Sequence, residues 1–412
     1  MSLIWGFIRS FQGHTKDLGV PKLKIGHRLI EDWTDMIANY TPWMWLIFGS
    51  IYAKYIKLLT SIEDVLGDTP AGTLPDLERI VGLPDFEWAA RRYMNASSYT
   101  YYRNGAAGEW SYRNNLEAYG RFRFKPRMLV DVTNIESTLP TTILGHNFSA
   151  PFYISPCARG GLAHPEAEKN FVKAAYEEDI LYIPSLYASL SVEEIAAAKP
   201  SNGSQTIFQQ VYLTENDTET KQLFEKVEKL GSKAIVFTVD SAADGNRHRA
   251  ARYGVGSADS SYTYITWDYY KKLQNMTSLP VVLKGIQSVE DVKLAVAHGA
   301  PAVILSNHGG RQLDGTPSPL EIALEIHEEA PELFEQIEIY ADGGIRYGAD
   351  VLKLLALGVR AVGLGRPFMF ANTYGVEGVK HAIQLLKHEI AIDAGNLGVG
   401  DLKKLDASYV SF

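Results

Sequence analysis

Short apolar runs recur from about residue 150 onward, each with a polar residue at or just beyond its end. Amphipathic stretches such as 165–179, 289–299 and 348–358 separate them, and the last two end in a helix-stopping glycine. Alternating strands and helices indicate a parallel sheet, and eight near-equal units favour a closed (β/α)8 TIM barrel over a doubly wound open sheet. The eight runs span residues 151–155, 180–185, 206–212, 234–240, 280–285, 302–308, 337–344 and 361–366.

The polar residues at the ends of these runs predict where chemistry takes place. In a (β/α)8 barrel the loops that follow the C-terminal strand ends form the active site. Polar residues placed at random would not gather at one end of nearly every strand, so we interpret them as one functional set. They are Ser155, Ser185, Gln210, Tyr212, Thr238, Asp240, Lys284, His308, Asp342 and Arg366.

The last two units have the composition of a phosphate site. Gly343, Gly344 and Gly365 permit close approach of the backbone to an anion, and Arg346 and Arg366 supply guanidinium groups suited to phosphate oxygens. A tight turn with solvated arginines is the alternative. Two Gly/Arg pairs in adjacent terminal units favour a phosphate-bearing ligand.

The segment before the barrel is less regular. Residues 76–94 predict one or two helices, and we assign residues 76–412 to the barrel domain and 1–75 to an N-terminal helical extension. The apolar run 43–53 is only about half the ~20 residues that a membrane-spanning helix needs. We expect it to pack on the main domain or on a neighbouring subunit, with contact to a membrane surface as the less favoured alternative.

Composition narrows the class of protein. The net charge is −8 and no block of Lys or Arg occurs, which argues against a nucleic-acid partner. Cys157 is the single cysteine, which excludes an internal disulfide framework and suits a reducing compartment. With no convincing signal peptide, and with a C-terminus that is not the S-K-L peroxisomal address, we expect a cytoplasmic location.

Six motifs in consistent order carry a family resemblance. S-N-H-G-G-R-Q-L-D, V-L-K-G, T-V-D, Q-x-Y, D-G-G-I-R and G-R-P-F together resemble the FMN-dependent 2-hydroxy-acid oxidases and dehydrogenases. The resemblance implies an FMN cofactor, a small 2-hydroxy acid substrate, oxygen or another electron acceptor, and a homo-oligomer of four or more subunits. No H-P-G-G haem-ligand signature occurs in residues 1–75, so a haem domain is not implied.

The resemblance also implies a role for each matching residue. His308 falls on the family's catalytic base, and substrate binding falls on Tyr101, Tyr187, Tyr212, Arg247 and Arg311. The segment that lies against the flavin would be Pro156, Cys157 and Ala158. Contacts to the flavin ring and the ribityl chain would come from Ser185, Gln210, Thr238, Lys284 and Ser306. The phosphate cradle would be Asp342, Gly343, Gly344, Arg346, Gly365 and Arg366.

Oxidation of a 2-hydroxy acid explains why these residue types are needed. An arginine such as Arg311 binds the carboxylate with two parallel hydrogen bonds, and His308, with an ordinary pKa of about 6.5, accepts a proton. That proton comes from the hydroxyl in a hydride route or from Cα in a carbanion route, and the residues leave both open. Asp240 would stabilise the imidazolium, and Lys284 would stabilise negative charge on the reduced flavin.

Each residue also has a structural interpretation. His308 could cap a helix, Asp240 could belong to a turn, and Lys284 could be a solvated strand end. Tyr101 and Tyr212 could be packing aromatics with hydrogen-bonded hydroxyl groups. At the level of function, the alternatives are a dehydrogenase that passes electrons to a quinone or cytochrome, a flavin-binding protein with altered or lost activity, and a barrel enzyme that binds another phosphorylated metabolite.

Several positions depart from the family pattern. After T-V-D, Ala242 and Ala243 replace the usual proline and arginine, and His248 replaces an acidic residue. Cys157 occupies a position that is often Thr, and Tyr187 one that is often Trp or a smaller apolar residue. We therefore expect a reshaped pocket and a substrate bulkier than glycolate.

Overall fold

Eight parallel strands form one sheet in the part of the chain that the computed structural model describes, residues 69–411 except 202, 214–215 and 257–264. Each strand coincides with one of the predicted apolar runs. The strands are β4 (Phe152–Ile154), β5 (Leu181–Tyr182), β6 (Gln209–Val211), β7 (Ile235–Thr238), β8 (Val281–Ile286), β9 (Ala302–Leu305), β10 (Glu338–Asp342) and β11 (Ala361–Leu364).

The sheet closes into a barrel. Its hydrogen-bonded order is β5-β4-β11-β10-β9-β8-β7-β6. A parallel bridge between Tyr182 and Ile207 joins the two end strands, and the Gln210 amide donates to the Pro184 carbonyl at 3.0 Å. The predicted TIM barrel is therefore confirmed, and the open doubly wound sheet is wrong.

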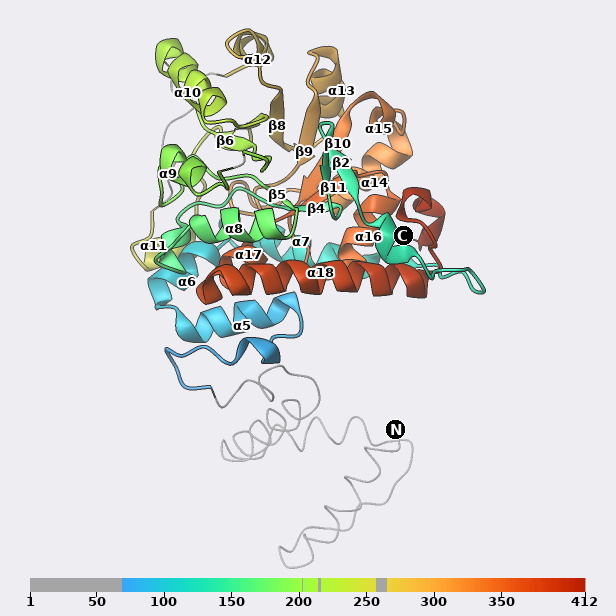
Figure 1. Ribbon diagram of the computed structural model, residues 1–412. Helices are drawn as coiled ribbons and strands as arrows, with labels where there is room; N and C mark the ends of the chain where they lie inside the picture. Colours follow the sequence, from blue (N-terminus) through green and yellow to red (C-terminus); the bar gives the residue numbers. More distant parts are fainter. Residues whose placement is uncertain (1–68, 202, 214–215, 257–264, 412) are drawn as a thin grey trace, which may run out of the picture. The chain divides into compact units, whose positions relative to one another are not determined.

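Helices surround the strands (Figure 1). Several begin at a polar cap: α14 starts after Ser318, whose side chain accepts from Glu321 N while the Glu321 carboxylate accepts from Ser318 N. The helices after β4 are η3 (Gly160–Leu162), α8 (Lys169–Glu177), α9 (Val192–Ala197), α10 (Asp217–Lys229), α11 (His248–Arg252), α12 (Trp267–Gln274), α13 (Val289–Ala297), α14 (Pro319–Glu329), α15 (Leu333–Gln336), α16 (Gly348–Ala356), α17 (Arg366–Ala371), η4 (Asn372–Tyr374), α18 (Gly375–Leu397), η5 (Leu402–Lys404) and η6 (Ala407–Tyr409).

Apolar side chains fill the N-terminal end of the barrel. The hairpin of β2 (Thr141–Ile143) and β3 (His146–Phe148) contributes Ile143 and Phe148 to the same buried cluster as Phe208 of the barrel. Because this end is packed with hydrocarbon, a ligand can enter the barrel only from the opposite, C-terminal end of the strands.

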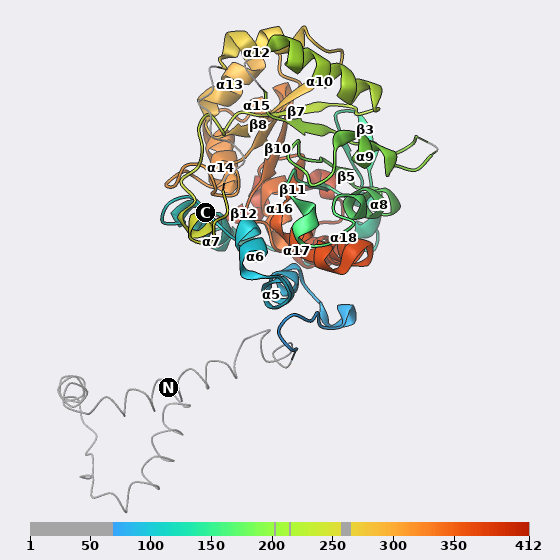
Figure 2. The ribbon, with the colours of Figure 1, turned by 90° about the vertical axis from the view of Figure 1, so that its left-hand side faces the viewer.

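Helices that precede the barrel lie beside the C-terminal strand ends. The segment contains η1 (Leu77–Arg79), α5 (Leu83–Tyr93), α6 (Ala96–Tyr102), α7 (Trp110–Arg121), β1 (Arg123–Phe124) and η2 (Ile135–Thr138), and β1 pairs antiparallel with β12 (Val410–Ser411). α5 packs on α17 (Figure 2), and α6 ends in Tyr101 and Tyr102. The helices predicted within 76–94 are present.

The proposed extension lies almost wholly outside the described residues, so the packing or membrane role of the run 43–53 stays a prediction. Within the described ranges, no helix has both the length and the apolar character to cross a bilayer.

Candidate active site

A pocket opens at the C-terminal ends of the strands and brings nearly all the predicted site residues together. It encloses about 990 Å³ of empty space, a figure that includes the solvent at its open mouth. Asp240 and Ser306 lie behind its wall. The predicted residues that line it are Tyr101, Pro156, Cys157, Ala158, Ser185, Tyr187, Gln210, Tyr212, Thr238, Arg247, Lys284, His308, Arg311, Asp342, Gly343, Gly344, Arg346, Gly365 and Arg366.

His308 and Asp240 form a hydrogen-bonded pair. His308 Nδ1 lies 2.7 Å from Asp240 Oδ1, and the Asp240 side chain is fully buried. Burial lowers the pKa of His308 and outweighs the opposing effect of Asp240. Burial by itself raises the pKa of Asp240, but His308 and Lys284 bring that pKa below its ordinary value. The stable state is therefore an aspartate that accepts from a neutral imidazole, which leaves Nε2 able to take a proton.

Local backbone geometry lets this pair form. His308 has φ 59°, in the left-handed region that histidine enters more readily than most residues, and its amide donates to Ser306 Oγ at 3.0 Å. Gly285 has φ 107°, and a Cβ there would lie 2.5 Å from the Asp240 Cβ. A glycine after Lys284 thus makes room for the carboxylate behind the histidine.

Lys284 belongs to a buried polar chain. Its Nζ lies 3.3 Å from Asp342 Oδ2 and donates to Ser306 Oγ at 3.1 Å, while Ser306 donates to Asp342 Oδ1 at 2.6 Å. Burial lowers the pKa of Lys284, but Asp342 and Asp240 raise it above its ordinary value, so the side chain is an ammonium. The alternative of a solvated strand end is wrong, and Ser306 supports the pocket from behind without lining it.

Arg247 and Arg311 bring two positive charges to one side of the pocket. Arg311 Nη2 donates to the Tyr101 carbonyl at 3.4 Å, and its buried Nε has no hydrogen-bond partner within the described residues. Arg247 Nε donates to the Arg311 carbonyl at 3.1 Å. Burial, followed by repulsion from Arg311, lowers the pKa of Arg247 to about 10. Adjacent, partly buried cations favour binding of an anion such as a carboxylate.

Two tyrosines form an aromatic wall next to these cations. The rings of Tyr187 and Tyr212 stack with centroids 5.0 Å apart and an interplanar angle of 18°. Tyr101 is buried, and the guanidinium of Arg159 lies 4.8 Å from its ring centroid. Packing is therefore part of what these tyrosines do, while all three also line the pocket.

The predicted phosphate residues also line the pocket. Arg366 donates to the carbonyls of Asn104 at 2.7 Å, Tyr102 at 2.8 Å and Gly309 at 3.1 Å, which uses three of its five N–H groups. The Arg346 side chain is 12% exposed and lies 3.7 Å from Glu87. Neither arginine is the freely solvated group of the alternative interpretation.

Gly344 serves a purpose that the sequence interpretation did not anticipate. A Cβ at Gly344 would lie 1.8 Å from the Asn115 carbonyl oxygen of α7, and φ is 85°. The close approach that requires this glycine is therefore the approach of α7. Gly343 has φ 128° and the hydroxyl of Tyr119, also in α7, donates to its carbonyl at 2.9 Å. These glycines dock a helix as well as shaping the pocket.

The charges of the pocket lining favour an acidic ligand. Among the lining residues, the carboxylate of Asp342 is offset by Lys284, and the cationic residues are Arg247, Lys284, Arg311, Arg346 and Arg366. Burying several cations together is unfavourable unless anions neutralise them. A phosphate at one side and a carboxylate at the other would supply that neutralisation.

Comparisons with known proteins agree on one family. The sequence model of the FMN-dependent dehydrogenase family matches residues 90–263 and 257–412. The chain belongs to this family. It is 38% identical over 355 residues to an L-lactate dehydrogenase (cytochrome) of Wickerhamomyces anomalus, covering 80% of this chain but only 61% of that protein. It is 34% identical over 365 residues to glycolate oxidase of Spinacia oleracea, covering 81% of this chain and 96% of the oxidase.

A solved structure gives the same assignment. The flavin-binding domain of baker's yeast flavocytochrome b2 matches with a TM-score of 0.78 and 38% identity, covering 82% of this chain and 88% of that domain. The FMN-dependent dehydrogenase family therefore accounts for both the fold and the expected cofactor.

The residues present fit the family's cofactor. Pro156, Cys157 and Ala158 form one wall of the pocket after β4, and burial raises the pKa of the Cys157 thiol, which keeps it neutral and apolar. Arg346 and Arg366 would hold the phosphate of FMN. Ser185, Gln210 and Thr238 line the same pocket and would contact the rest of the cofactor. The individual roles of these residues stay predictions.

Sequence reasoning missed several residues that shape the site. Tyr102, Gly309 and Met369 line the pocket, and the loop between α6 and α7 receives Arg366 through the Asn104 carbonyl. Glu168 is fully buried and accepts from the amides of Gly160 at 2.7 Å and Ser189 at 2.9 Å. The sequence shows Glu168 only as an acidic residue near a predicted helix start, and it does not show that Gly160 and Ser189 are its partners.

Proposed function

We propose that this protein uses FMN to oxidise a 2-hydroxy acid to the corresponding 2-oxo acid. The observation that carries this proposal is the His308–Asp240 pair beside Arg247 and Arg311, in a pocket that Arg346 and Arg366 also line. A base next to a carboxylate-binding pair is what this oxidation needs. FMN, when bound, supplies the two-electron oxidant.

Arg311 and Arg247 bind and orient the substrate in this proposal. Arg311 Nε, which has no partner in the part of the chain that the structure describes, and a neighbouring N–H offer a carboxylate two parallel hydrogen bonds. Tyr101 and Tyr212 line the same pocket, and the guanidinium of Arg311 lies 5.5 Å from the Tyr101 ring centroid. Fixing the carboxylate sets the position of the hydroxyl and of the Cα–H on the same substrate.

His308 then accepts a proton at Nε2, and Asp240 stabilises the resulting imidazolium. This role requires a neutral imidazole at working pH, and the lowered pKa of His308 supports it. Lys284 provides a buried positive charge that favours negative charge developing nearby. In both the hydride and the carbanion route His308 is the proton acceptor and Asp240 supports it; the routes differ in the substrate atom that gives up the proton.

Oxygen is the electron acceptor that we propose, with release of hydrogen peroxide. A cytochrome or quinone acceptor is the second candidate, and it is favoured by the 38% identity to an L-lactate dehydrogenase (cytochrome). Measuring peroxide yield against turnover with an artificial acceptor separates the two. Peroxide in equal amount to the product supports the oxidase, and turnover only with the artificial acceptor supports the dehydrogenase.

A visible spectrum and anaerobic reduction test the proposal as a whole. The purified protein should show flavin absorption bands that a 2-hydroxy acid bleaches without oxygen. A yellow protein that no 2-hydroxy acid bleaches would support a non-catalytic flavin-binding protein, and a colourless one would support another phosphorylated ligand. Rates with glycolate, lactate and longer 2-hydroxy acids test the expected bulkier substrate, and a clear optimum at glycolate would count against it.

Two further expectations stand as proposals. We propose a homo-oligomer of at least four subunits, which light scattering of the full chain tests. We propose a cytoplasmic location, for which the single cysteine is the support, and cell fractionation tests it.

A further inference from the structure

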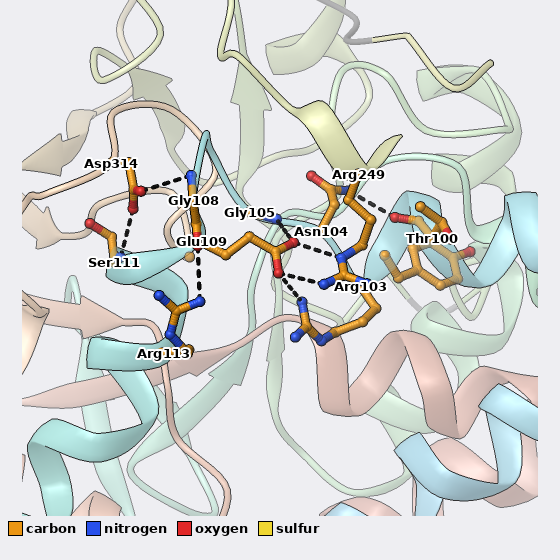
Figure 3. A network of polar contacts seen from close by, with 12 residues as sticks. Thr100, Arg103, Asn104, Gly105, Gly108, Glu109, Ser111, Arg113, Arg249 and Asp314 are labelled. Carbon is orange, nitrogen blue, oxygen red and sulfur yellow. Dashed lines mark hydrogen bonds and ion pairs between the residues drawn. The ribbon is translucent and has the colours of Figure 1, made fainter. Parts of the chain in front are cut away.

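A second polar network is centred on the loop between α6 and α7 (Figure 3). Its centre is Glu109, which is buried although its partner Arg249 is half exposed. Arg249 Nε donates to Glu109 Oε1 at 2.8 Å and Arg249 Nη2 to Oε2 at 2.7 Å. The amide of Gly105 donates to Oε1 at 3.0 Å, and Arg103 Nη1 to Oε2 at 3.4 Å. Both carboxylate oxygens are therefore occupied by charge-assisted hydrogen bonds.

Glu109 does not serve the helix that it precedes. It occupies the N-cap position of α7, yet its side chain makes no cap hydrogen bond. Asp314 takes that place, accepting from Ser111 N at 2.8 Å and from Gly108 N at 3.1 Å. Glu109 also has φ 61°, an unfavourable conformation for a glutamate. A residue that only ended a loop would need neither the strain nor the burial.

The network ends on α11, the short helix that follows Arg247. Five residues form too few intrahelical hydrogen bonds to be stable alone, so the position of α11 depends on contacts with the rest of the protein. Arg247 occupies its N-cap position and lines the pocket. The loop holds this segment at two points, through the pair of Arg249 and Glu109 and through the amide of Ala107, which donates to the Asn246 carbonyl at 2.7 Å.

The same loop contacts the segment that carries His308. The amide of Ala106 donates to the Gly310 carbonyl at 2.8 Å, and the two Asp314 hydrogen bonds lie four residues further along. The loop between α6 and α7 is thus hydrogen-bonded to the segment that carries His308 and Arg311 and to the segment that carries Arg247. Movement of α11 relative to residues 308–314 would change the separation of Arg247 and Arg311.

We propose that Glu109 is a positioning residue which, through Arg249, holds α11 so that Arg247 reaches the pocket beside Arg311. Burial opposes ionisation of Glu109, but Arg249 and Arg103 lower its pKa to about 2, so the pairing persists at all working pH values. The readout on substrate rests on the proposed function. The position of α11 can be tested without it.

A double-mutant cycle tests the proposal on the flavin-loaded protein. The variants are Glu109→Gln, Arg249→Gln and the combination of both. Binding of pyruvate and of 2-oxooctanoate is measured from the change in the flavin spectrum, alongside KM, kcat and Tm. We expect each single variant to weaken binding and raise KM by about tenfold, and the combination to be no worse than either, because the variants remove one shared interaction. We expect kcat to change by less than about threefold.

Two matched controls separate contact from charge. Arg252→Gln removes the same charge from the exposed surface of the same helix, and Glu117→Gln removes a carboxylate from the exposed surface of α7. Both should bind the 2-oxo acids as the unmodified protein does. Arg249 is half exposed, so its substitution should fold even if the change at Glu109 does not.

Three results would overturn the proposal. Arg249→Gln binding like the unmodified protein would show that Glu109 does not act through α11. Equal effects of Arg252→Gln and Arg249→Gln would show a general charge effect. Additive effects in the combination would show two independent roles.

If the unmodified protein binds no 2-oxo acid, the proposed function fails and the binding test cannot be read. Limited trypsin digestion then tests the positioning role by itself. Cleavage after Arg252 should be several-fold faster in Glu109→Gln and Arg249→Gln than in Glu117→Gln, because α11 is released. Equal cleavage rates would refute the positioning role on their own.

Discussion

The two ends of the barrel are made by the same eight strands but do different work. At the N-terminal end, Phe148 and Ile143 of a hairpin fill the interior with hydrocarbon. At the C-terminal end, the strands deliver Lys284 and Asp342 to a polar pocket. A single strand shows the contrast, since β10 has Tyr340 in the buried cluster and Asp342 at the pocket.

The pocket end leaves buried polar atoms that a ligand can satisfy. Buried atoms without a hydrogen-bond partner within the described residues include Asp240 Oδ2 and Arg311 Nε, both beside the pocket. Such atoms are unfavourable for folding and favourable for binding a polar ligand. We therefore expect the apolar end to govern stability and the polar end to govern chemistry, and four substitutions test that division.

Substitution of the proposed base should have the largest effect. His308→Gln should lower kcat by about 10³-fold, because general-base catalysis typically contributes 10²–10⁴-fold, with Tm nearly unchanged. Steady-state rates and a thermal melt of the same preparation measure both. A large loss of Tm at near-normal kcat would reverse the assignment of this end to chemistry.

Truncation at the opposite end should do the reverse. Phe148→Ala should reduce the free energy of unfolding by about 3–5 kcal/mol, since it removes a buried ring from the hairpin that closes the barrel. Denaturant titration measures the loss, and kcat per folded, flavin-loaded molecule should stay unchanged. If catalysis fell while stability held, the two ends would not be separable.

Asp240→Asn tests the electrostatic pairing at the polar end. Asp240 raises the pKa of His308 against the larger effect of burial, so without the carboxylate this pKa should fall further below its ordinary value. A weaker base then lowers kcat by about 10²-fold, and the decline of kcat/KM towards acid should begin at a lower pH. A pH–rate profile measures the shift. An acid limb that stays in place would mean that it reports another group.

The smallest expected effect concerns the cofactor side. Arg346→Lys should weaken FMN binding by about tenfold, because a lysine cannot offer the paired N–H groups of a guanidinium to a phosphate. Flavin release followed by fluorescence measures it. Arg360→Lys is the matched control, since Arg360 lies 3.6 Å from Glu338 at the N-terminal end of β10 and is exposed. Similar loss in both variants would contradict a phosphate role for Arg346.

The local pattern of the chain was sufficient to predict the barrel and the polar residues at its strand ends, whereas Tyr101, Arg247 and Arg311 were predicted from the family resemblance. Alternation of apolar runs with helical stretches depends on neighbours within about 18 residues, so it can be read before the chain folds. Boundaries were less accurate. The helix expected over 165–179 occupies only Lys169–Glu177, because Ala167 has φ 47°, a left-handed conformation that a right-handed helix cannot include.

By itself, the sequence determined the family, the barrel and the end of it that holds the chemistry, because a run of apolar residues and the polar residue after it are local features. Only the tertiary structure decided the pairings. Asp240 and His308 are 68 positions apart, and Glu109 and Arg249 are 140 apart. Whether an aspartate caps a turn or supports a histidine depends on which strands and loops pack together. A short sequence motif carries no information about contacts at that separation.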